Sequence, residues 1–122
     1  MKVAVPVDDK NMETSVCMSF GRAPYFMIYD TDTKEHSFLD NSAADSPGGA
    51  GIKAAQTIVD HHVDVLLTPR CGENAAGVIK AAGIDLYKTE PQSAIDNINA
   101  LVIGKLSSLN DIHPGFHSRK GR

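Results

Sequence analysis

The chain contains little cysteine: Cys17 and Cys71 are the two thiols among its 122 residues. They lie far apart in the sequence, so they fit neither a disulfide framework nor a Cys-x-x-Cys zinc pattern. We therefore expect both thiols to be reduced.

The chain also lacks a long apolar run and an excess of basic residues. No segment approaches the length that spans a bilayer, and the valine-rich stretch from Val3 leaves no room before it for a secretory leader. The net charge is −3, whereas nucleic-acid binding depends on clustered Lys and Arg. We expect a cytoplasmic protein with no nucleic-acid or membrane partner, and we expect the short basic end, residues 119–122, to be a solvated terminus.

Strand and helix patterns alternate along the chain, whose length suits one domain. Valine-rich residues 2–7 predict a buried strand, and residues 25–29 with 35–39 predict an antiparallel hairpin. Residues 63–67 and 84–87 predict two parallel strands. Apolar spacing predicts helices over residues 52–61 and 72–82 and a last helix that opens at Pro91, with a fraying tail from residue 106.

This order predicts a mixed five-stranded α/β sheet in which an antiparallel hairpin joins a parallel core. The carboxyl ends of the parallel strands then share one edge of the sheet, where open α/β sheets bind ligands. Three glycine-bearing segments reach this edge: residues 19–26 (SFGRAPYF), 48–52 (GGAGI) and 66–72 (LLTPRCG). Glycine permits close backbone approach, so these loops are expected to converge on something bound.

Three motifs, FGRAPYF, PGGAGIKAAQ and VDVLLTPRCGENAAGVIKAAGIDLY, resemble the dinitrogenase iron-molybdenum cofactor-binding family, which includes NifX-like and NafY-like carriers and a domain attached to NifB. The resemblance covers residues 1–105 and leaves residues 106–122 as a C-terminal tail. It implies a ribonuclease-H-like three-layer fold with helices on both faces of the sheet. It also implies a non-enzymatic role: holding or ferrying an iron–sulfur-based cluster, which can contain molybdenum, between a donor and an acceptor protein.

The candidate cofactor-binding residues lie in the three glycine segments or, for Cys17, just before the first of them: Cys17, Phe20, Gly21, Arg22, Gly48, Gly49, Ala50, Gly51, Arg70, Cys71 and Gly72. Cys71 precedes a predicted helix N-terminus, whose dipole favours a thiolate, and Cys17 is predicted to face it. Soft sulfur ligands suit iron–sulfur chemistry. The arginines are candidates for contacting the charge of an anionic ligand, or for pairing with the nearby aspartates.

Two thiols are too few for a conventional cluster, which has four protein ligands. Either a homodimer shares the cluster, histidines or exogenous thiols complete it, or the cluster brings its own ligands. His113 and His117, four residues apart near the end of the chain, are candidate metal ligands together with Cys17 and Cys71. His36 is expected on an edge strand, where a partner subunit could cover it.

Two alternatives stay open. One is a binding module of the same fold for another small anionic ligand or a protein partner, in which the cysteines have no ligand role. The more remote one is a magnesium-dependent nuclease, since Asp8 and Asp9 follow the first predicted strand. No Ser-His-acid signature supports other catalysis.

Overall fold

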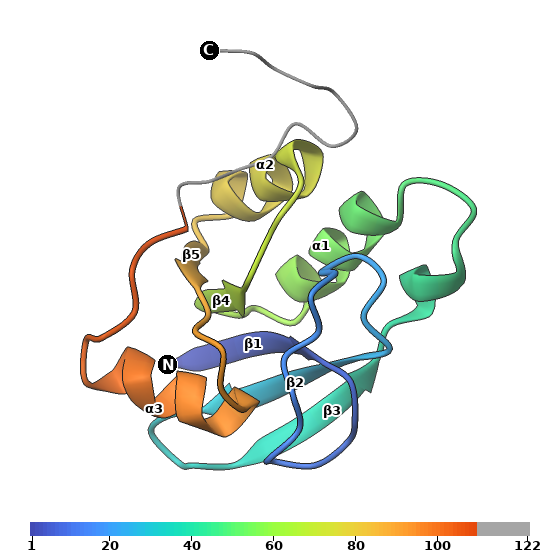
Figure 1. Cartoon of the computed structure of the whole chain (residues 1–122). Helices are drawn as coiled ribbons and strands as arrows, with labels where there is room; N and C mark the ends of the chain where they lie inside the picture. The colour runs from blue at the N-terminus through green and yellow to red at the C-terminus, as the bar shows by residue number, and fades with distance from the viewer. Residues whose placement is uncertain (110–122) are drawn as a thin grey trace.

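The computed structural model describes residues 1–109, which form a single sheet with helices packed on it (Figure 1). The elements in chain order are β1 (Lys2–Val7), β2 (Tyr25–Asp30), β3 (His36–Asp40), the 3-10 helix η1 (Ser42–Asp45), α1 (Ala50–Asp60), β4 (Val65–Thr68), α2 (Glu73–Ala81), β5 (Asp85–Lys88) and α3 (Ala94–Val102).

The sheet has five strands in the order β3-β2-β1-β4-β5. β1 pairs antiparallel with β2 and parallel with β4, β2 pairs antiparallel with β3, and β4 pairs parallel with β5. The predicted combination of an antiparallel hairpin and a parallel core is confirmed. β1 lies at the centre because its valine-rich sequence can be buried on both faces of the sheet.

Helices cover both faces of the sheet, as predicted (Figure 1). α1 and α2 pack together on one face over a core that includes Ile58, Leu66 and Ile79. α3 covers the other face, where Ala94 and Ile98 join Val3, Val5 and Leu67 among other residues of a second core. The ribonuclease-H-like designation stays a prediction.

Two details differ from the sequence predictions. The last helix does not open at Pro91: α3 begins at Ala94, because the Ser93 side chain accepts a hydrogen bond from the Asp96 N–H and so caps the helix. The expected fraying from residue 106 does not begin there either. Leu106 and Leu109 are buried, and the Leu109 N–H donates to the Leu86 carbonyl at 3.0 Å.

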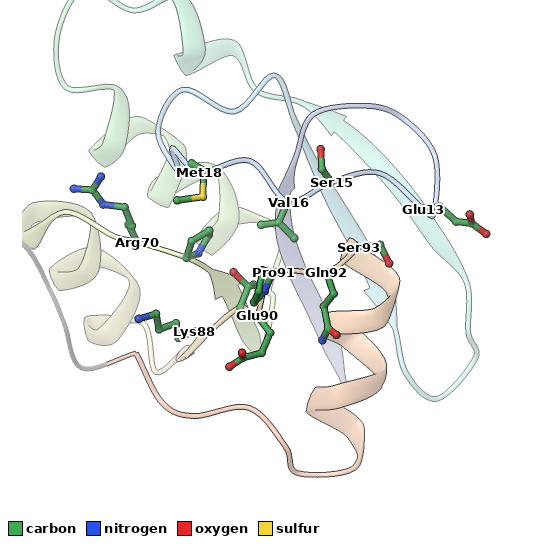
Figure 2. A pocket seen from close by; sticks show the side chains of 12 residues that line it. Glu13, Ser15, Val16, Met18, Arg70, Lys88, Glu90, Pro91, Gln92 and Ser93 are labelled. Atoms are coloured by element: carbon green, nitrogen blue, oxygen red, sulfur yellow. The ribbon is translucent and has the colours of Figure 1, made fainter.

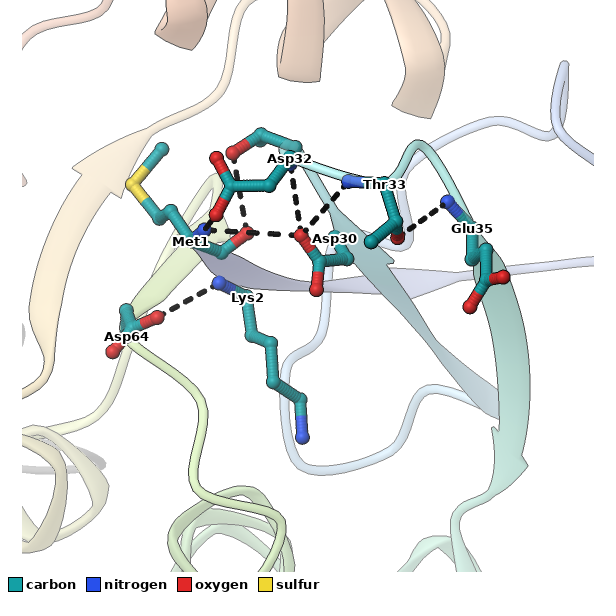
Figure 3. Close-up of polar contacts among 8 residues, drawn as sticks. Met1, Lys2, Asp30, Asp32, Thr33, Glu35 and Asp64 are labelled. Carbon is teal, nitrogen blue, oxygen red and sulfur yellow. Dashed lines mark hydrogen bonds and ion pairs between the residues drawn. The ribbon is translucent and has the colours of Figure 1, made fainter.

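The end of the sheet opposite the glycine loops is closed by short polar contacts (Figure 3). The Asp30 carboxylate accepts hydrogen bonds from the backbone N–H groups of Asp32 and Thr33, which lower its pKa. The Lys2 N–H donates to the Asp64 carboxylate at 2.8 Å. His61 ends α1 at this end of the sheet, as expected, and is exposed. Among residues 1–109, no helix is long and apolar enough to cross a membrane.

Candidate functional site

Two hollows open at the carboxyl edge of the parallel strands. The first, here called the Cys71 hollow, has a volume of about 450 Å³ and lies between the β1–β2 loop and the first turns of α1 and α2. It is lined by Ser19, Phe20, Gly21, Arg22, Gly49, Ala50, Gly51, Ile52, Arg70, Cys71, Gly72, Glu73, Asn74 and Ala75. The three glycine loops therefore meet, as the sequence predicted.

The N-termini of α1 and α2 both open into the Cys71 hollow. Their N-cap residues are Gly49 and Gly72, and neither helix has a side-chain cap. The helices that do not line the hollow differ: Asn41 caps η1 and Ser93 caps α3 with side-chain oxygens. The first N–H groups of α1 and α2 thus lack the side-chain acceptor that the other helices have, and two helix dipoles place partial positive charge at one place.

The charged side chains of the Cys71 hollow have different roles. Arg22 donates from Nη1 to the carbonyls of Ala44 at 2.9 Å and Ser46 at 2.7 Å, so it holds the η1 loop. Arg70 is exposed, and no ion pair or side-chain hydrogen bond engages its guanidinium among the described residues. Glu73, in the first turn of α2, adds one negative charge at the mouth. Of the two arginines, Arg70 has the guanidinium available for a ligand.

Cys71 lies deep in the Cys71 hollow and is not a ready thiolate. Its side chain is 1% exposed, and burial raises the pKa of the thiol to about 11. The predicted thiolate gains no support here, because burial disfavours the charged form of the thiol more than the positive charge of Lys80 favours it.

Cys17 and Gly48 do not line the Cys71 hollow. The Cys17 N–H donates to the Pro6 carbonyl at 2.9 Å, which holds this residue against the end of β1. Burial raises the pKa of the half-buried Cys17 thiol, and Asp8 raises it further. The expectation that Cys17 faces Cys71 across one site is not met. His113 and His117 lie outside the described residues.

The second hollow, here called the Pro91 hollow, was not predicted from the sequence (Figure 2). Its volume is about 680 Å³, and it is lined by Glu13, Ser15, Val16, Met18, Pro69, Arg70, Lys88, Thr89, Glu90, Pro91, Gln92 and Ser93. Arg70 is the residue that it shares with the Cys71 hollow. The sequence signal for this hollow was the connection between the predicted strand at residues 84–87 and the helix expected from Pro91, because that connection lies at the same edge of the sheet.

Asn97 fixes the wall of the Pro91 hollow. This side chain is fully buried, accepts from the Glu90 N–H at 2.7 Å, and donates to the carbonyls of Glu90, Gln92 and Ser93. The β1–β2 loop is joined to the same wall, because the Ala94 N–H donates to the Thr14 carbonyl. The hollow is thus bounded by fixed loops.

Within residues 1–109, no three His, Cys, Asp or Glu side chains are grouped so that they could hold a metal ion. Asp8 instead accepts a hydrogen bond from the Ser15 hydroxyl. The nuclease alternative needs several converging carboxylates, so it gains no support from this part of the chain. The loop edge thus combines two hollows, two helix N-termini without side-chain caps and the exposed Arg70.

The chain belongs to the dinitrogenase iron-molybdenum cofactor family, whose sequence profile matches residues 1–104. It is 30% identical to the uncharacterized protein MJ0580 of Methanocaldococcus jannaschii over an alignment of 109 residues. This alignment covers 87% of this chain and 89% of that one.

Two solved structures share the fold along most of the chain. The apo form of the orange protein from Desulfovibrio gigas superposes with a TM-score of 0.85 at 28% identity, covering 89% of this chain and 92% of that one. The Thermotoga protein TM1290, which has been related to NifB, gives a TM-score of 0.79 at 33% identity, with 98% of each chain covered. The family predicted from the three motifs is confirmed.

Proposed function

We propose that this chain is a non-enzymatic carrier that holds an iron–sulfur-based metal cluster, with or without molybdenum, as cargo in the Cys71 hollow. Membership in a family named for the iron-molybdenum cofactor supports the class of cargo. The observation that carries the proposal is the convergence of two helix N-termini without side-chain caps on one hollow, beside the Arg70 guanidinium, which no residue within 1–109 engages.

These groups suit an anion that arrives with its own ligands. Backbone N–H groups at helix N-termini and a guanidinium donate hydrogen bonds to sulfide, oxide or carboxylate acceptors. Within residues 1–109, no three His, Cys, Asp or Glu side chains are grouped to hold a metal ion, so Cys71 offers this hollow at most one metal–sulfur bond. Of the three ways to complete the cluster, we therefore favour a cluster that brings its own ligands.

The hollow is open enough for cargo to enter and leave. Ile52 on its rim is 44% exposed, whereas the floor contains Phe20, which is 4% exposed and packs on Phe26 with ring centroids 5.4 Å apart. A firm floor below an open mouth suits reversible holding. Donor and acceptor proteins would meet the cargo at this mouth.

The test is anaerobic incubation with iron, sulfide and molybdate, followed by metal and acid-labile sulfide analysis and a visible absorption spectrum. We expect coloured protein with stoichiometric metal. Arg70→Ala should weaken retention of the cargo roughly tenfold, because one charged hydrogen-bond donor is lost. Lys88→Ala is the matched control, since Lys88 lines the Pro91 hollow and not the Cys71 hollow.

Colourless, metal-free protein after incubation would overturn the carrier proposal. The second candidate, a binding module for another small anion, would then be favoured, because the two helix N-termini and Arg70 suit any anion that fits the hollow. Cys17→Ala and Cys71→Ala separate the modes of holding. Unchanged loading in both variants fits a cluster held with its own ligands, whereas loss in either points to a metal–sulfur bond.

A further inference from the structure

The two edges of the sheet differ in how they are covered. Residues 107–109 lie along β5: the Lys88 N–H donates to the Ser107 carbonyl at 2.9 Å, and Tyr87 forms a bridge with Ser108. β3 is the other edge, and no strand within residues 1–109 pairs with its outer side. β3 contains neither the proline nor the lysine that commonly protect an exposed edge from pairing.

The hydrogen bonds at the two ends of β3 show which backbone groups point outward. The Asp30 N–H donates to the Glu35 carbonyl at 2.9 Å, and the Asn41 N–H donates to the Pro24 carbonyl at 3.1 Å. Backbone groups alternate in direction along an antiparallel strand, so residues 35, 37, 39 and 41 face β2. The N–H and C=O groups of His36, Phe38 and Asp40 therefore face outward.

The same three residues share one face of the sheet, because side chains alternate between faces. Phe38 is half-buried against the core beneath α3, and the His36 ring stands edge-on to it at 5.6 Å. Asp40 is 78% exposed, with its carboxylate 3.2 Å from the Lys10 Nζ. The outward strip thus has an imidazole at one end, a phenyl ring in the middle and a carboxylate at the other end.

We propose that β3 pairs antiparallel with β3 of a second copy of this chain, about a two-fold axis at Phe38. In this register His36 lies opposite Asp40 of the second copy, and Phe38 lies opposite Phe38 of the second copy. Every outward N–H and C=O of His36, Phe38 and Asp40 then has a partner. A shift by two residues in either direction would leave one of the three residues on each strand unpaired.

The sequence of the strip favours a second copy over an unrelated strand. An imidazole opposite a carboxylate and an aromatic pair are favourable cross-strand neighbours, and the two-fold axis produces the His–Asp pair twice. The contact is self-complementary, so it closes as a dimer. Growth into a fibre through the other edge is opposed, because residues 107–109 already occupy the β5 edge.

This dimer leaves both Cys71 hollows open. β3 runs parallel to β1, since both are antiparallel to β2. Antiparallel pairing of β3 with its copy therefore points the two loop edges in opposite directions. Each copy would hold its own cargo, so this inference does not depend on the proposed function.

Sedimentation equilibrium of the full chain over a concentration series tests the proposal, and we expect a reversible dimer. His36→Asp places a carboxylate opposite Asp40 of the second copy twice, which should weaken dimerisation at least tenfold. In the exchanged variant H36D/D40H, a carboxylate again lies opposite an imidazole of the second copy. This variant should recover most of the dimerisation affinity. Ser37→Asp is the matched control: it adds the same charge on the opposite face and should have a smaller effect.

Amide hydrogen exchange gives an independent readout of the register. The N–H groups of His36, Phe38 and Asp40 should be protected at high concentration and exchange quickly on dilution, whereas those of Ser37 and Leu39 should be protected in both. A monomer at every concentration would overturn the proposal. A dimer that H36D leaves unchanged, or that protects other amides, would also overturn it. Cargo loading of H36D should equal that of the wild type, so failure here is distinct from failure of the carrier proposal.

Discussion

Gly21 lies against the first turn of α1, where a side-chain carbon on Gly21 would stand 2.9 Å from the backbone nitrogen of Gly51. The close approach of these two backbones is by itself enough to require glycine here. Gly21→Ala should lower the free energy of unfolding by about 1–3 kcal/mol, since neither backbone can yield without moving α1 or the β1–β2 loop. Urea denaturation measures this change.

Gly77→Ala is the matched control. Gly77 lies inside α2, and nothing stands within 4 Å of the position that its side-chain carbon would take. Alanine should stabilise the helix there by about 0.5–1 kcal/mol. Equal effects of the two substitutions would contradict the close approach of Gly21 to α1.

The Cys71 thiol should make stability depend on pH in the alkaline range. Burial raises its pKa from 9.0 to about 11, so the folded state keeps a proton that the unfolded state releases. The resulting stabilisation is fully present below pH 9, where both states are protonated. It is lost as pH rises toward about 11, and it amounts to about 2–3 kcal/mol.

Urea denaturation of the wild type and Cys71→Ala at several values between pH 8 and pH 11 checks this prediction. The difference between their free energies of unfolding should shrink as pH rises through the range set by 9.0 and about 11. A constant difference would show that Cys71 ionises as easily in the folded chain as in the unfolded one. Cys17→Ala serves for comparison, because that thiol is only half-buried.

Asn97 should contribute strongly to stability although it does not line the Cys71 hollow. Asn97→Ala leaves the partly buried Glu90 N–H without its 2.7 Å acceptor and leaves three carbonyls without the Asn97 donor. We expect the free energy of unfolding to fall by about 2–4 kcal/mol. Asn99→Ala is the control on the same helix, since Asn99 is exposed, and it should change stability by less than about 0.5 kcal/mol.

Asn97→Asp tests the donor half of this network. The introduced carboxyl can still accept from the Glu90 N–H, but its charged form would face the carbonyls of Glu90, Gln92 and Ser93. Its pKa should therefore be raised in the folded state, and stability should increase as pH falls through that value. An N97D variant as stable at neutral pH as at acidic pH would contradict the assigned donor role.

The sheet could be predicted because its signals are local. Val3, Ala4 and Val5 mark a strand buried on both faces by composition alone, and the residues before Gly83 show helical periodicity. The start of α3 was misplaced because Pro91 and Ser93 both carry N-terminal signals. The sequence does not show that the Asn97 side chain donates to the Gln92 carbonyl in the turn after Pro91, or that Ser93 is the residue that caps the helix.

The site was harder to predict because its chemistry depends on contacts between distant residues. The loops that meet were recognisable from their glycines, but the role of Arg22 depends on carbonyls more than twenty residues away, those of Ala44 and Ser46. The thiol of Cys71 follows the same rule, since the burial that raises its pKa comes from packing rather than from its position before α2.

Arg22 and Arg70 line the same hollow, and we expect substitution to show that their roles differ. Arg22→Ala removes the hydrogen bonds to the Ala44 and Ser46 carbonyls, which should lower the free energy of unfolding by about 0.5–1.5 kcal/mol at this exposed position and speed amide exchange around η1. Arg70→Ala should leave both quantities within error, since its guanidinium engages no residue in the described part of the chain. Cargo retention should respond in the opposite order, with the larger loss in Arg70→Ala. Faster exchange at residues 42–46 in both variants would contradict a loop-holding role that belongs to Arg22 alone. A larger loss of cargo in Arg22→Ala would contradict the assignment of Arg70 as the main contact to the anion.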